Sequence, residues 1–186
     1  MPTETSVGIL LRMQRTTKTP RGRQPPKARA HKLVQGPDDP VLAQINFMIS
    51  RAAYLYLYWV ERSLADAGIE RFLKPGMGPV LFTLFDRDNV SMAELVRRTG
   101  LVASTISRTV KAMTQTGVVT TSRDPADARS VVVSLTDTGR SLEPKCMHLA
   151  KKIDQIVLGG LRPADVTAVR KGLSRIIQNL TEEAGG

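Results

Sequence analysis

The segment 103–116 constrains the fold most, because a helical repeat of apolar residues runs through it and stops at Gly117. Ile106, Val110 and Met113 recur at three- and four-residue spacing, and on a helix they fall within about 60° of one another. This pattern predicts a helix with one buried face.

A repeat typical of β-strands begins directly after this helix. The runs 118–121 and 131–133 consist of valine and threonine, which favour strands. The loop between them, 122–129, is polar and contains a proline, so the two runs are expected to form a hairpin with a long tip. Such a hairpin would place Arg123 and Arg129 at its tip.

Two shorter helices are expected before this helix and hairpin. Pro79 suits the first turn of a helix over about 79–87. Ser91, followed three residues later by Glu94, is the pattern of a capping box and predicts a helix over 91–98. The expected fold class is therefore mainly α with a small β-wing, the winged helix-turn-helix arrangement.

The polar face of the helix 103–116 has the chemistry that a reader of the major groove needs. Arg108 is expected to make a bidentate contact with a guanine, and Lys111 to meet a phosphate. The arginines at the hairpin tip would reach the adjacent minor groove or its phosphates. The alternative is that this polar face is an ordinary solvated surface. It is disfavoured because a helix, a turn, a second helix without acidic residues and a basic wing occur together in this order. The residues expected to face DNA on the helix are Ser104, Thr105, Ser107, Arg108, Lys111 and Gln115.

Long helices are expected on both sides of this unit. The segment 40–67 is apolar on most faces in its second half, which is typical of a helix deep in a core or shared between subunits. Helices over 138–158 and 163–180 are expected near the C-terminus. The residues expected to form the buried stripes of these helices are Leu42, Ile45, Ile49, Ala53, Tyr56, Val60, Leu142, Met147, Ile153, Ile156, Val157, Val166, Val169, Leu173, Ile176, Ile177 and Leu180.

Residues 1–40 supply half of the formal net charge of +10, so the folded part is only mildly basic. Residues 12–40 contain five prolines and two glycines among basic residues, with few large apolar ones. The segment 1–39 is therefore expected to be a disordered basic tail. The tail could lie along DNA phosphates as an arm. It could also be a passive tail, or its first residues could come from a mis-assigned start codon, with Met13 as one candidate for the true start. The segment also has a faint likeness to an organelle transit peptide.

Several classes of protein are disfavoured by composition. No apolar run is long enough to cross a bilayer, and no secretory signal is evident. A lone cysteine, Cys146, rules out an intrachain disulfide and suits the cytoplasm. His31 and His148 are too isolated for a metal site, and no acid pair or nucleophile–base motif is present. We therefore expect neither an enzyme nor a bound cofactor.

The segment 41–180 resembles the MarR family of bacterial transcription regulators. The most specific likeness is the wing, in which Asp-x-Arg is followed six residues later by Leu-Thr and then by glycine. The matching stretches are Ser-Met-Ala-Glu-Leu from Ser91, Ser-Thr-Ile-Ser-Arg from Ser104, Gly-Val-Val from Gly117, Arg-Asp-Pro-Ala-Asp-Ala-Arg from Arg123, and Leu-Thr-Asp-Thr-Gly from Leu135.

This resemblance implies a domain over 40–182 that forms a homodimer on pseudo-palindromic operators. Dimerisation helices would lie at about 40–67 and 138–180, and the DNA-binding lobe at about 79–137. The implied wing has Asp127 shaping the loop and Arg129 entering the minor groove. Thr121 and Ala128 depart from the family pattern, which often has arginine and a larger residue there. If that arginine pairs with the wing aspartate in the family, Asp127 lacks this partner here. Arg123 could substitute, or the wing could be looser.

Small ligands of the family, often phenolic, bind between the dimerisation helices and the DNA-binding lobe. The candidates by position are Tyr54, Tyr58, Trp59 and Arg62, for which simple packing in the dimer or core is the alternative. Cys146 could sense oxidants as in some relatives, or be buried and inert.

The expected function is a transcription regulator that binds double-stranded DNA as a homodimer and is released by a small effector, for which an aromatic compound is expected. The first alternative is an architectural winged-helix protein that coats DNA without an operator and without ligand control. A winged helix that binds protein is a second. An RNA-binding protein is disfavoured because the basic regions lack aromatic stacking platforms.

Overall fold

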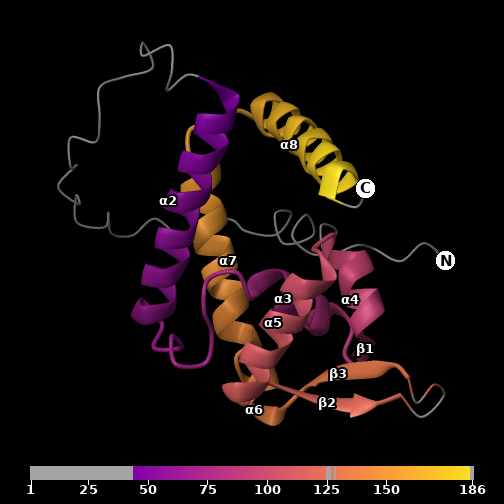
Figure 1. Ribbon diagram of the computed structural model, residues 1–186. Helices are drawn as coiled ribbons and strands as arrows, with labels where there is room; N and C mark the ends of the chain where they lie inside the picture. The colour runs from indigo at the N-terminus through magenta and orange to yellow at the C-terminus, as the bar shows by residue number, and fades with distance from the viewer. Residues whose placement is uncertain (1–43, 125–126, 128, 185–186) are drawn as a thin grey trace. The chain divides into compact units, whose positions relative to one another are not determined.

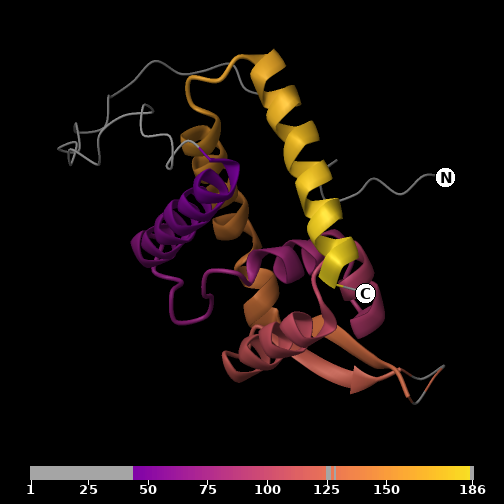
Figure 2. The same cartoon turned by 45° about the horizontal axis from the view of Figure 1, so that its top comes forward.

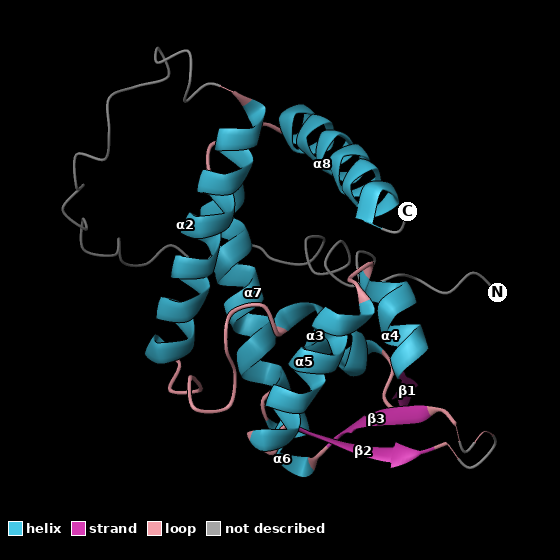
Figure 3. Cartoon of the chain, in the orientation of Figure 1, coloured by secondary structure: helices cyan, strands magenta, loops and turns pink. Residues whose placement is uncertain are grey.

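A computed structural model describes residues 44–124, 127 and 129–184. The expectations for the tail 1–39 and for Leu42 lie outside these residues. The chain divides into two compact units, Met1–Leu57 and Tyr58–Gly186, with the boundary inside the first described helix. Figures 1 and 3 show the elements, which are α2 (Ile45–Asp66), α3 (Gly78–Asp86), β1 (Val90–Ser91), α4 (Met92–Thr99), α5 (Ala103–Gln115), β2 (Val119–Arg123), β3 (Val131–Leu135), α6 (Asp137–Ser141), α7 (Glu143–Leu158) and α8 (Pro163–Ala184).

Helices α4 and α5 form the expected helix-turn-helix. The Ser91 hydroxyl accepts a hydrogen bond of 3.2 Å from the Glu94 backbone N–H, which confirms the predicted N-cap of α4. The Glu94 side chain does not complete a capping box, because its carboxylate binds Arg97 three residues later at 2.5 and 2.7 Å. Gly100 ends α4 in the left-handed region at φ 68°, a conformation that glycine adopts without strain.

The wing is a three-stranded antiparallel sheet with the order β1-β3-β2. β2 and β3 pair from Val119 opposite Leu135 to Arg123 opposite Val131, which confirms the predicted hairpin. β1 was not predicted. Its two residues pair with β3, with Val90 opposite Val133, so the strand exists only through a contact distant in sequence. Figure 2 shows the hairpin projecting beyond α4 and α5.

A single hydrophobic core holds the helix-turn-helix to the sheet. Leu95 of α4, Ile106 and Met113 of α5 and Val133 of β3 have no exposed surface. They belong to one cluster with residues of α3 and with Leu142 and Cys146 near the start of α7. The predicted buried stripe of α5 is thereby confirmed, and its polar face is left pointing away from this core.

The region expected to be one helix over 138–158 is divided at Leu142. Thr136 caps α6, accepting a bond of 3.0 Å from the Gly139 N–H, and α7 begins with Glu143 and Pro144. The break has a local cause, because a proline lacks the backbone N–H that a continuous helix needs. Leu142 is buried at this junction.

Several residues expected to be buried on the long helices are exposed in the single chain. This correction applies to part of the predicted stripes of α2, α7 and α8, and its physical reason is that an apolar repeat predicts a face suited to burial without fixing whether the cover comes from the same chain. The exposed members are Ile45, Ala53, Tyr56, Ile156, Val157, Val169, Leu173, Ile177 and Leu180, whereas Ile49, Val60, Met147, Val166 and Ile176 are half-buried and Ile153 is buried.

Candidate nucleic-acid interface

The outer face of α5 is a continuous polar surface. Thr105 is half-buried there, and the side chain of Arg108 folds back so that Nε donates to the Ser104 carbonyl at 3.4 Å. This hydrogen bond is long and exposed, so the guanidinium can leave it for a better acceptor at little cost. No acidic residue occurs on α5 to compete for the guanidinium. The exposed members of the predicted set on this helix are Ser104, Ser107, Arg108, Lys111 and Gln115.

The wing loop is shaped by Asp127. Its carboxylate oxygen Oδ1 accepts the Arg129 backbone N–H at 3.0 Å, and its backbone carbonyl accepts the Ser130 N–H at 2.8 Å. The Asp124 N–H donates to the Ser130 carbonyl at 2.9 Å and closes the base of the loop. Asp127 therefore has a backbone partner although position 121 is threonine. Arg123 and Arg129 are both exposed.

The turn between α3 and β1 fixes the base of the wing. Asp88 Oδ1 accepts the Leu135 backbone N–H at 2.8 Å, and Asp88 Oδ2 binds the Arg140 guanidinium of α6. Asn89, in the left-handed region at φ 58°, accepts the Ser134 hydroxyl at 2.7 Å. One turn is thus bonded to both β3 and α6. The sequence indicated a turn here, but these partners, more than 40 residues away, left no local signal.

A second polar contact joins α3 to α4. The Arg98 guanidinium donates to the Asp86 carboxylate, and the two side chains are only 14% and 19% exposed. Arg98 Nε lies 4.0 Å from Glu94, and Arg98 Nη1 is buried without a hydrogen-bond partner among the described residues. The ion pair fixes α4, the first helix of the helix-turn-helix, against α3. The Glu94 pKa is lowered from its ordinary value mainly by its hydrogen bond with Arg97.

Three of the four ligand candidates on α2 lie together. The Arg62 guanidinium donates to the Tyr58 hydroxyl at 3.5 Å and lies 6.0 Å from the centre of the Trp59 ring. The Tyr58 and Trp59 rings meet edge to face at 6.0 Å. The bond to Tyr58 is the main reason that the Arg62 pKa is raised. Tyr54 is 78% exposed, one turn earlier on the same helix.

Cys146 is buried in the core, and burial raises the pKa of its thiol to about 11. A thiol of that pKa is almost wholly protonated at neutral pH and reacts slowly with oxidants, which argues against a sensor. Among the described residues, no group of three or more side chains could hold a metal ion. In the same part of the chain, no helix is long and apolar enough to cross a membrane.

Comparison with known proteins finds similarity to one family. Residues 78–130 match the model of the MarR family. The chain is 31% identical over 105 residues to the HTH-type transcriptional repressor NicR of Pseudomonas putida, a match that covers 56% of this chain and 66%, just under two thirds, of NicR.

Solved structures extend the likeness to most of the chain. Bordetella bronchiseptica BpsR, whose structure was described in work on the regulation of its DNA binding by 6-hydroxynicotinic acid, superposes with a TM-score of 0.63 at 27% identity over 73% of this chain and 94% of that chain. A probable transcriptional regulator from Pseudomonas aeruginosa superposes with a TM-score of 0.62 at 26% identity over 73% of this chain and 98% of that chain. With its helix-turn-helix, its basic wing and these relatives, the chain has a winged helix-turn-helix fold and is similar to the MarR family of transcription regulators.

Proposed function

We propose that this protein is a transcription regulator that binds a pseudo-palindromic DNA operator as a homodimer and is released by a small aromatic effector. The observation that carries the proposal is the outer face of α5. It presents exposed hydroxyl, guanidinium, ammonium and amide donors and no acidic residue. A helix of this chemistry fits the major groove of B-DNA.

Each candidate residue has an expected role at the DNA. Arg108 would exchange its long bond with the Ser104 carbonyl for the O6 and N7 atoms of a guanine. Lys111 would contact a phosphate, and Arg129, positioned by Asp127, would enter the minor groove with Arg123 nearby. The remaining hydroxyl and amide donors of α5, on Ser104, Thr105, Ser107 and Gln115, would fix the helix against the backbone.

Dimerisation is supported by the apolar faces of the long helices. Leu173 and Ile177 on α8 are 46% and 59% exposed, and α2 also exposes several large apolar side chains. Contiguous apolar surface of this kind marks a protein interface. We therefore assign the helices within 40–67 and 138–180 to dimerisation, the lobe 79–137 to DNA, and the segment 1–39 to a separate basic tail.

The effector and the direction of control are proposed from the relatives. BpsR is regulated by 6-hydroxynicotinic acid and NicR is a repressor, so repression relieved by an aromatic acid is the leading model for this chain. The site proposed for that acid is the group Tyr54, Tyr58, Trp59 and Arg62, in which a guanidinium and two rings already lie together. A regulator of this kind would act in the cytoplasm.

The DNA proposal is tested by binding to an operator found by footprinting on flanking intergenic DNA. At fixed salt the wild type should prefer its operator to random duplex by ~10³-fold or more. Arg108→Ala and Arg129→Ala should each weaken operator binding about tenfold or more, because bidentate and minor-groove contacts are lost. Arg71→Ala, which removes an arginine outside α5 and the wing, is the control and should bind like the wild type.

The same measurements separate the alternatives. Equal affinity for operator and random duplex would indicate an architectural DNA-binding protein. Unchanged affinity in both arginine variants would favour a winged helix that binds protein.

The dimer proposal is tested by Leu173→Glu and Ile177→Glu. A charge in the apolar face of α8 should abolish the dimer in sedimentation experiments and lower operator affinity at least tenfold, because two half-sites are bound together only by a dimer. Ser174→Glu, on the neighbouring face of α8, should leave the dimer intact. A monomeric variant with full operator affinity would contradict the assignment.

A further inference from the structure

An apolar side chain, that of Val102, lies exposed at the start of α5. Val102 is 50% exposed, whereas the preceding Leu101 packs against the hydrophobic core. The Val102 backbone carbonyl accepts the first hydrogen bonds of the helix, from the Thr105 N–H at 2.9 Å and the Ile106 N–H at 3.1 Å. The backbone of Val102 is therefore fixed to the helix while its side chain faces solvent.

Valine is an unfavourable residue for this position as far as helix stability is concerned. Val102 is the N-cap of α5 and makes no side-chain hydrogen bond there, although a serine, threonine or aspartate could accept a free backbone N–H. Ser91 of α4 and Thr136 of α6 do so at 3.2 and 3.0 Å. Two other helices begin at an apolar residue, but Met77 of α3 and Leu142 of α7 are buried. An exposed valine that neither caps its helix nor fills the core points to a function at the surface.

The neighbours of Val102 belong to the surface proposed to enter the major groove. Ala103 and Ser104 follow it and are both exposed. Arg108 Nε reaches back to the Ser104 carbonyl at 3.4 Å, so the guanidinium proposed to read a guanine lies at the same end of the helix. The N-terminal residues of a recognition helix are those that contact base edges. Val102 and Ala103 thus give this end of α5 an apolar edge beside its polar donors.

The major groove offers one apolar group to such an edge, the C5 methyl group of thymine. The other base edges present hydrogen-bond donors and acceptors, which a valine side chain cannot satisfy. Burying one methyl group against another apolar group is worth about fourfold in affinity. A cytosine in the same place lacks the methyl group and presents an amino group instead.

From these observations we infer that Val102, with Ala103 beside it, contacts the methyl group of one thymine in each half of the operator and thereby selects thymine over cytosine at that base pair. The inference rests on the proposed function, because it requires α5 to lie in the major groove. It adds a specificity-determining residue to that function, one that acts through apolar contact where Arg108 acts through hydrogen bonds.

The test is a scan of the footprinted operator in which each thymine in turn is replaced by deoxyuridine, which lacks only the methyl group. At fixed salt, wild-type affinity should fall about fourfold at one thymine of each half-site, and about fifteenfold when both are replaced together. At the same position, 5-methylcytosine should bind more tightly than cytosine, because the methyl group is kept.

Val102→Ser separates recognition from folding. The new serine can accept a backbone N–H as Ser91 does in α4, so the urea midpoint should equal or exceed that of the wild type. The variant should nevertheless bind the unmodified operator about tenfold more weakly, and it should no longer distinguish thymine from uracil. Val131→Ala is the matched control, because it removes a valine of 40% exposure from β3, and it should keep the wild-type ratio of thymine to uracil affinity.

The outcomes distinguish failure of this inference from failure of the proposed function. A wild type that binds its operator but is indifferent to uracil at every thymine would overturn the inference and leave the proposed function intact. The same thymine-to-uracil ratio in the wild type and in Val102→Ser would do likewise. A protein without preference for any operator would refute the proposed function and the inference with it.

Discussion

Replacing Gly139 with alanine is expected to lower the free energy of unfolding by about 3 kcal/mol. A Cβ atom at this buried position would lie 2.1 Å from the Val118 carbonyl oxygen and 3.1 Å from Leu135 Cδ2. The carbonyl cannot easily retreat, since it accepts the Thr136 N–H at 3.1 Å and thereby holds the start of α6 against the wing. The measurement is urea unfolding at one fixed protein concentration, because dimerisation would shift the midpoint.

Gly172→Ala is the matched control for this substitution. Gly172 lies within α8 and has no neighbouring atom within 4 Å of the position of a Cβ. Its replacement should raise stability by up to about 1 kcal/mol, because alanine is the better helix former. A Gly139→Ala protein that unfolds within about 0.5 kcal/mol of the wild type would show that the wing moves away from α6 freely.

Asp86→Ala is expected to cost about 3 kcal/mol, because it leaves the Arg98 guanidinium nearly buried without its main partner. Arg98 cannot lose its proton in compensation. The loss should appear as a lower urea midpoint, and also as weaker operator binding, since the pair fixes α4 against α3.

Two further variants test whether the orphaned charge causes the loss. The double variant Asp86→Leu with Arg98→Met removes both charges and should be more stable than Asp86→Ala alone. Asp165→Ala removes one member of the exposed pair with Arg162 and should change the urea midpoint little. If Asp86→Ala proved as mild as Asp165→Ala, the Arg98 site would have to be well solvated.

The helix-turn-helix and the wing were predictable because their signals are local. The spacing of Ile106, Val110 and Met113 was enough to identify the buried face of α5, and all three are buried. The cap at Ser91 and the left-handed end at Gly100 depend on neighbouring residues alone. The outward face of α5, and with it Arg108, followed from the same geometry.

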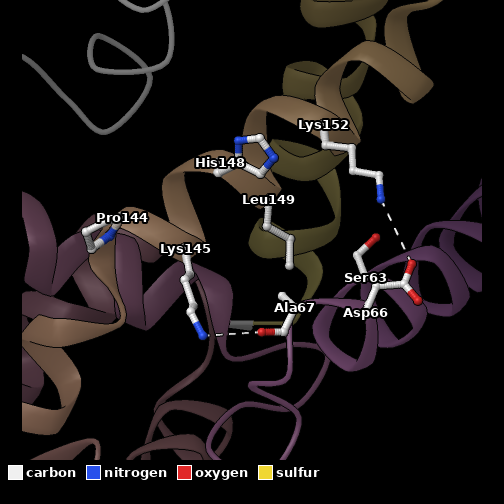
Figure 4. A pocket seen from close by; sticks show the side chains of 8 residues that line it. All are labelled: Ser63, Asp66, Ala67, Pro144, Lys145, His148, Leu149 and Lys152. Carbon is white, nitrogen blue, oxygen red and sulfur yellow. Dashed lines mark hydrogen bonds and ion pairs between the residues drawn. The ribbon is translucent and has the colours of Figure 1, made fainter. Parts of the chain in front are cut away.

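The features that the sequence did not reveal depend on contacts between distant segments. β1 is two residues long and is defined only by its pairing with β3. The bonds of Asp88 with Leu135 and Arg140 likewise join positions 47 and 52 residues apart. The hollow between the end of α2 and the first half of α7, which Lys145 and Lys152 line in Figure 4, also depends on two distant segments. Neither segment alone contains a motif that would have predicted it.

The apolar stripes of the long helices show a different limit. Periodicity correctly located α8, but it predicted that Leu173 and Ile177 would be buried, and both are exposed in the single chain. A repeat of apolar residues indicates that a helix face is buried in the functional assembly. It does not indicate whether the residues that bury it belong to the same chain or to another copy.

The position of β2 at the edge of the sheet has a consequence for solubility. β2 pairs with β3 on one side only, and four of its five residues are exposed. An open edge of this kind can recruit a strand from a neighbouring molecule and begin aggregation. Arg123 and the small hydroxyl residues before it oppose such pairing, whereas valines in their place would favour it. The arginine proposed to approach DNA therefore also helps to keep separate molecules of the regulator from joining at their wings.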